Sequence, residues 1–118
     1  MRSDDAVADF SSRGPTRFEN YAKPDIVTAG YAIVSLEASG SYLLTNYPHL
    51  EVAPGYFRLS GTSMAAPIAA GAAALMFDGN PELSAHTVKA VLQFTAQYIP
   101  DVDAMTQGAG ELNVAGAV

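Results

Sequence analysis

Cysteine and tryptophan are absent from this sequence, and positive charge is scarce. The 118 residues contain six lysines and arginines against twelve acidic residues, so the formal net charge is −6. Without cysteine, the chain can form neither a disulfide framework nor a thiolate metal site. The basic residues are scattered and form no patch that would neutralise phosphates, so a nucleic-acid partner is not expected.

Long hydrophobic runs are also lacking. The most apolar stretch, residues 64–77, has no charged residue, but it is shorter than the ~20 residues that a membrane-spanning helix needs. We therefore expect a buried helix there and no membrane partner. No apolar segment of the signal-peptide type follows Met1, and the chain as written is expected in the cytoplasm.

The composition is that of a folded protein, with 49% hydrophobic and 15% charged residues. We expect one α/β domain over residues 1–118. Short apolar runs predict strands at residues 7–10, 25–27 and 33–36, while residues 37–54 lack a clear period and predict a long surface loop. A second helix is predicted from Ser84, which suits an N-cap, to about Tyr98, and a short one within residues 111–118.

The segment that suggests chemistry is residues 61–67, which reads Gly-Thr-Ser-Met-Ala-Ala-Pro. It places Ser63 on a sharp turn at the start of the apolar helix, where free N–H groups and the positive end of the helix dipole favour an anion. Pro67 is predicted in the first turn, where an N–H has no acceptor within the helix. The plain alternative is that Ser63 only caps the helix.

Residues 61–67, followed by Ala-Gly-Ala-Ala-Ala-Leu at 70–75, resemble the nucleophile segment of the subtilisin-like serine proteases, or subtilases. The likeness continues in the family's order through residues 9–16, 23–27, 80–81, 88–89, 107–110 and 112–113. The resemblance implies that Ser63 is the acyl-forming nucleophile, that residues 23–30 form a core strand and turn beside it, and that the fold is a partial doubly wound one with the Ser63 helix at its centre. Many relatives have proline at the position of Ala29 and histidine at that of Ile68. The family is mostly secreted.

The same resemblance shows what this chain lacks. The family's triad runs Asp, His, Ser along the chain, and in subtilisin itself the histidine precedes the serine by roughly 150 residues. The oxyanion asparagine lies roughly 65 residues upstream, whereas only 62 residues precede Ser63. Asn20 and Asn46 stand in unrelated contexts. We therefore expect a subtilase fragment without the triad Asp and His or the oxyanion Asn, inactive as a peptidase alone.

Two histidines leave a different chemistry open. His49 faces the same way as Glu51 if the chain is extended there, and His86 follows Glu82 by four residues. Either pair offers two ligands to a divalent metal such as zinc, which needs at least three from protein. No cofactor is expected for the subtilase fragment, and a metal site would require subunits that pool their ligands. The plain alternative is that both histidines are ordinary exposed residues.

Two further functions follow from these alternatives. One is a stand-alone oligomeric hydrolase of activated esters or phosphoesters, with a new metal-dependent site at a subunit interface. The other is a non-enzymatic module that completes another subtilase, whose chain would supply the missing half of the fold. Because a helix that is apolar all round must be covered, and the second helix and a few strands can cover only one side, we also expect a homo-oligomer.

Overall fold

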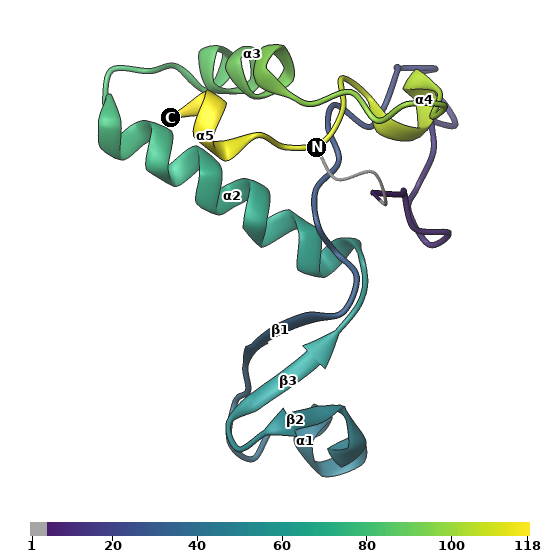
Figure 1. Ribbon diagram of the computed structural model, residues 1–118, viewed down its shortest axis with the longest axis vertical. Helices are drawn as coiled ribbons and strands as arrows, with labels where there is room; N and C mark the ends of the chain where they lie inside the picture. The colour runs from purple at the N-terminus through teal and green to yellow at the C-terminus, as the bar shows by residue number, and fades with distance from the viewer. Residues whose placement is uncertain (1–4) are drawn as a thin grey trace.

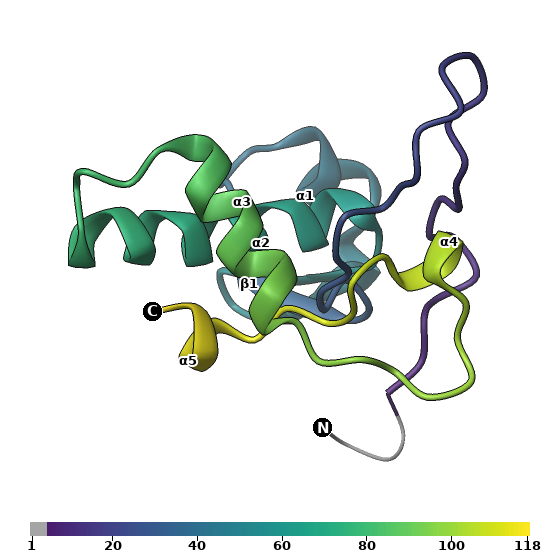
Figure 2. The same ribbon diagram turned by 90° about the horizontal axis from the view of Figure 1, so that it is seen from above.

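Two groups of elements meet at the start of one long helix (Figure 1). The computed structural model describes residues 5–118. Helix α2 (Thr62–Gly79) and helix α3 (Ala85–Thr95) both contact the short α5 (Val114–Ala117). Seen from above, α3 crosses over α2 (Figure 2). A small sheet lies beyond the first turn of α2 (Figure 1). The α/β class expected from the sequence is confirmed.

The sheet is antiparallel and has three strands in the order β1-β3-β2. Ile33 pairs with Leu59, and Ser35 pairs with Phe57. Because directly opposed residues of a sheet share one face, these four side chains lie on the same side, where Phe57 is buried. The strands are β1 (Ile33–Leu36), β2 (Glu51–Ala53) and β3 (Tyr56–Leu59).

The long loop predicted at residues 37–54 is wrong. The structure has helix α1 (Tyr42–Asn46), the 3-10 helix η1 (Pro48–Leu50) and strand β2 there. The side chain of Ser41 caps α1 by accepting a hydrogen bond from the Leu44 N–H at 3.2 Å. A turn at Gly55, with φ +84°, then reverses the chain from β2 into β3. These elements are too short to show a period in the sequence.

Helix α2 lies where a buried helix was predicted, but the predicted burial is wrong for this chain, because α3, α5 and the sheet cover only a small part of the helix. Its buried residues are Ala72 and Met76, whereas the side chain of Leu75 is 51% exposed. Pro67 lies in the second turn and not in the predicted first turn, so it withholds the N–H that the carbonyl of Ser63 would accept in a regular helix. No helix in the described part of the chain is both long and apolar enough for a membrane span.

Helix α3 begins as predicted and ends earlier than predicted. The Ser84 side chain accepts a hydrogen bond from the Thr87 N–H at 3.1 Å, and Val88 is buried beneath the helix. The helix ends at Thr95 and not near Tyr98, because Gln97 forms an antiparallel bridge with Glu111.

The predicted strands at residues 7–10 and 25–27 are not regular strands. Val27 forms one isolated parallel bridge with Glu111, and this bridge is the only parallel pairing within residues 5–118.

The turn from Ile99 to Gln107 is held by the side chain of Gln107, which is fully buried. Its side chain accepts from the Ile99 N–H at 2.7 Å and donates to the Ile99 carbonyl at 2.9 Å. Gln107 closes the short helix α4 (Ala104–Gln107).

Candidate active site

The turn that carries Ser63 is packed against residues from the preceding part of the chain. The Gly61 N–H donates to the Gly30 carbonyl at 2.8 Å. A Cβ atom on Gly30 would lie 2.9 Å from the Gly61 carbonyl oxygen and 3.1 Å from the Ala65 Cβ. Only glycine at position 30 therefore allows the two backbones to come this close. Residues 23–30, which the family resemblance places beside Ser63, do contact the turn that carries it.

The first turn of α2 has no side-chain cap. Its N-cap residue is Gly61, which has no side chain that could accept a hydrogen bond. The interpretation of Ser63 as a simple helix cap is therefore wrong, since Ser63 is the second residue of the helix. The uncapped N–H groups and the positive end of the helix dipole lie next to the Ser63 side chain, which is exposed. This environment stabilises a negative oxygen.

A hollow of about 510 Å³ adjoins Ser63 between the sheet and the first turns of α2. Its walls are mostly apolar, and its polar side chains come from serines and from one acid, Glu37. Among the described residues that line it there is no histidine. The lining includes Ile33, Glu37, Leu43, Phe57, Ser63 and Met64.

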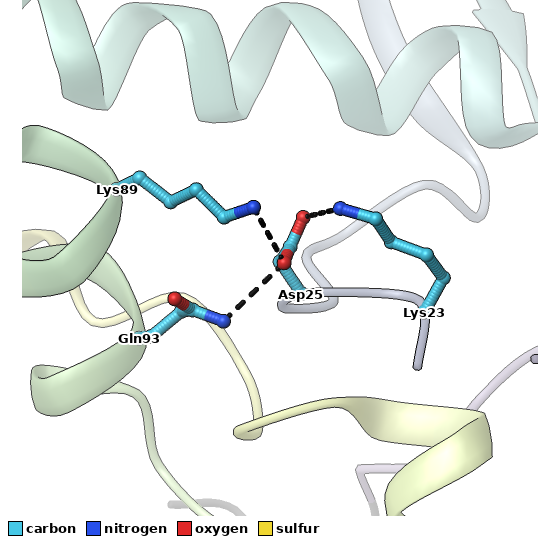
Figure 3. A network of polar contacts seen from close by, with 4 residues as sticks. All are labelled: Lys23, Asp25, Lys89 and Gln93. Atoms are coloured by element: carbon cyan, nitrogen blue, oxygen red, sulfur yellow. Dashed lines mark hydrogen bonds and ion pairs between the residues drawn. The ribbon is translucent and has the colours of Figure 1, made fainter. Parts of the chain in front are cut away.

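A second polar cluster surrounds Asp25 (Figure 3). Lys23 and Lys89 form ion pairs with its carboxylate, the latter at 2.9 Å, and the Gln93 side-chain amide donates to it at 3.3 Å. Partial burial raises the pKa of the Asp25 carboxyl, but the hydrogen bonds from Lys23 and Lys89 outweigh this and lower the pKa below its ordinary value. The cluster therefore joins residues 23–25 to α3.

The two histidines lie on separate elements. His49 is in η1, where its ring meets that of Tyr47 edge-on at 6.2 Å, and His86 is exposed in the first turn of α3. Their paired acids Glu51 and Glu82 are also exposed. Within residues 5–118, no three His, Cys, Asp or Glu side chains gather as metal ligands would. The structure holds a single chain, so metal binding between subunits stays a prediction.

A family model described as "Subtilase family" matches residues 1–117. The chain belongs to the subtilase family. The serine protease AprX of Bacillus subtilis is 44% identical over 115 residues, which are 98% of this chain and 26% of that protein. The minor extracellular protease Vpr of the same organism is 37% identical over 95% of this chain and 14% of its own length.

Solved structures agree with this membership. The subtilase chain aligns with the CspB protease of Clostridium perfringens with a TM-score of 0.71 and 28% identity, over 94% of this chain and 22% of that one. The prenylagaramide maturation protease PagA aligns with a TM-score of 0.66 and 28% identity, over 99% and 38%. This subtilase sequence thus spans between about a seventh and two fifths of the length of these relatives.

Two features of the site were not predicted from the sequence. The sequence predicts Glu37 in a loop without a clear period, although its spacing of two and four residues from Ser35 and Ile33 puts it on their face of an extended strand. The Asp25 cluster joins residues more than sixty positions apart, since Lys89 and Gln93 come from α3. A pattern of neighbouring residues in the sequence cannot predict a contact between residues so far apart.

Proposed function

We propose that this chain is the nucleophile-bearing part of a subtilisin-like serine hydrolase and that Ser63 is the nucleophile. The observation that carries the proposal is the place of Ser63, exposed on an uncapped helix start beside a hollow of about 510 Å³. The family membership of residues 1–117 supports the same role.

In this proposal the Ser63 Oγ attacks a substrate carbonyl and forms a tetrahedral intermediate, and the backbone N–H of Ser63 donates to its oxyanion. The intermediate then expels the leaving group, which takes up a proton from the protonated base, and an acyl ester on Ser63 remains. The hydroxyl proton must pass to a base. Since no histidine lines the hollow among the described residues, we infer that the Asp, the His and the oxyanion Asn come from polypeptide outside this sequence. Without that base the serine keeps an unactivated hydroxyl.

A fluorophosphonate probe tests this assignment. We expect little labelling of the isolated chain and rapid labelling of Ser63 once the chain is combined with the polypeptide that precedes the matching segment in AprX. Ser63→Ala is expected to abolish labelling. Ser39→Ala, which changes an exposed serine that does not line the hollow, is expected to leave labelling unchanged. Rapid labelling of Ser63 in the isolated chain would show that it needs no outside base.

A complementing role is favoured by the apolar surface of the chain. Phe94 on α3 is 90% exposed and Leu36 on β1 is 76% exposed, and they are two of many large apolar side chains that are exposed. Extensive exposed apolar surface is typical of a protein that binds another chain. A chain that supplies the rest of a subtilase domain would cover them. Binding of the isolated chain to that AprX polypeptide, measured with Ser63→Ala so that chemistry plays no part, tests this non-enzymatic reading.

The metal-dependent alternative requires His49 or His86 to meet ligands from another copy. It predicts that purified protein carries stoichiometric zinc or a similar divalent ion and hydrolyses an activated ester. Activity would then fall with chelator and with His49→Ala or His86→Ala, and it would survive in Ser63→Ala. Metal-free protein with chelator-insensitive activity would exclude this alternative. The cytoplasmic location expected from the sequence stays a prediction, and the relative Vpr is named an extracellular protease.

A further inference from the structure

An unpaired carboxylate oxygen lies at the hollow that Ser63 lines. Glu37 directly follows β1, and its Oε2 atom is buried without a hydrogen-bond partner. The ion pairs formed within residues 5–118 join Lys23 and Lys89 to Asp25, and none of them reaches Glu37. Among the described residues, Glu37 therefore has no ion-pair partner.

Glu37 as a whole is half-buried, but leaving its buried carboxylate oxygen unpaired is unfavourable, because that atom loses hydration and gains no partner. Buried polar atoms without partners are uncommon in native proteins and point to a missing ion, water or ligand. Glu37 lines a hollow with room for such a group. The net charge of −6 also favours the approach of cations over anions.

The walls of the hollow restrict the kind of cation. Ile33 and Phe57 share one face of the sheet, and Leu43 from α1 and Met64 from α2 complete an apolar lining. Apolar walls with one acid suit a group that has an alkyl stem and a charged end, as a lysine side chain does. A small hydrated metal ion would gain nothing from these walls.

We propose that this hollow is a binding site for an alkylammonium group and that the Glu37 carboxylate is its ion-pair partner. The apolar side chains of Ile33, Leu43 and Phe57 cover the alkyl stem. We further infer a role in substrate selection, and this step rests on the proposed function. The Glu37 carboxylate binds a basic side chain of the substrate, so the site selects substrates with a basic residue close to the bond that Ser63 attacks. Binding of the amine itself does not depend on the reactivity of Ser63.

The experiment is a titration of the 118-residue chain with n-butylammonium chloride and, separately, with 1-butanol, followed by NMR chemical shifts. We expect the ammonium to bind at least tenfold more tightly, which corresponds to about 1.4 kcal/mol. Glu37→Gln is expected to remove this preference. Glu19→Gln, which changes an exposed acid that does not line the hollow, is expected to retain it.

A stability measurement separates binding from a structural role. Because Oε2 has no partner to lose, Glu37→Gln is expected to leave the unfolding midpoint in urea unchanged or higher, and Glu37→Met serves as a second neutral variant. Equal affinity for amine and alcohol, or an unchanged preference in Glu37→Gln, would overturn the proposal. Tight amine binding without any labelling of Ser63 in the complemented protein would instead overturn only the proposed function.

Discussion

The Gly61 N–H and the Gly30 carbonyl oxygen lie 2.8 Å apart, so the turn before Ser63 is fixed to a residue that precedes β1. The contact is made between two backbones, and Gly30 has no side chain to keep them apart. The position of the proposed nucleophile therefore depends on Gly30 as much as on the helix that follows it.

Gly30→Ala is expected to destabilise the chain by about 1–3 kcal/mol, because the new Cβ would overlap the Gly61 carbonyl and crowd Ala65. Urea unfolding followed by circular dichroism measures this loss. Gly71→Ala is the matched control, since a Cβ there meets nothing within 4 Å and should stabilise α2 by about 0.5–1 kcal/mol. Identical unfolding midpoints for Gly30→Ala and the parent chain would show that the turn tolerates displacement.

The Asp25 cluster gives a pH dependence with a definite sign. The folded-state pKa of Asp25 is lowered, so its contribution to stability is present above the unfolded-state pKa of about 3.9 and is lost as the pH falls through the folded value. We expect Asp25→Asn to cost about 0.5–1 kcal/mol at pH 7, a small figure because the side chain is 31% exposed.

The measurement is the urea midpoint of the parent chain and of Asp25→Asn at pH 7 and again near pH 2. The difference between the two proteins should shrink at the lower pH. Asp78→Asn, an exposed acid near the end of α2, provides the comparison for a change of net charge. A constant difference at both pH values would mean that the ion pairs with Lys23 and Lys89 contribute nothing.

Gln107→Leu is expected to destabilise the chain by about 2–3 kcal/mol. The side chain is buried and satisfies both backbone groups of Ile99, and a buried N–H or C=O left without a partner costs about 1–3 kcal/mol. Thermal melting measures the loss. Gln97→Leu, at an exposed position, is expected to change stability by less than about 0.5 kcal/mol.

Self-association is expected through the exposed apolar surface of α2 and α3. Leu75 and Phe94 are 51% and 90% exposed, and about 400 Å² of such surface in water forgoes about 10 kcal/mol at 25 cal/mol per Å². Light scattering at micromolar concentration should show a homo-oligomer, and Leu75→Gln with Phe94→Gln should shift it to monomer. Tyr21→Gln, which removes an exposed aromatic side chain outside α2 and α3, is the control. A folded monomer with a concentration-independent melting temperature contradicts the prediction.

The sequence predicted those features that depend on residues close together in the chain. The apolar run of α2, the Ser84 cap of α3 and the strand at Ile33–Leu36 are all present. The family was predicted from residues 61–67 and is confirmed. Ser63 as nucleophile and His49 and His86 as metal ligands stay predictions.

What the sequence could not predict depends on distant pairing. Residues 25–27 form only a bridge because the partner of Val27 is Glu111 at the other end of the chain. The strand β2 exists because β3 lies beside it, and its three residues carry no period of their own. The unpaired oxygen of Glu37 is likewise a property of the folded surroundings and not of the residue.

The sheet and α1 form a single excursion of the chain that leaves and returns at one place. Ala32 donates to the Ser60 Oγ at 2.8 Å, beside the bond between Gly30 and Gly61. Since the ends of this excursion are fixed to each other, residues 33–59 could be exchanged as one segment without moving the start of α2. A replacement of different length would change the loop-closure entropy only slightly. The wall of the hollow and the proposed nucleophile would then be able to evolve separately, so that preference for one substrate over another can change while the reacting serine stays in place.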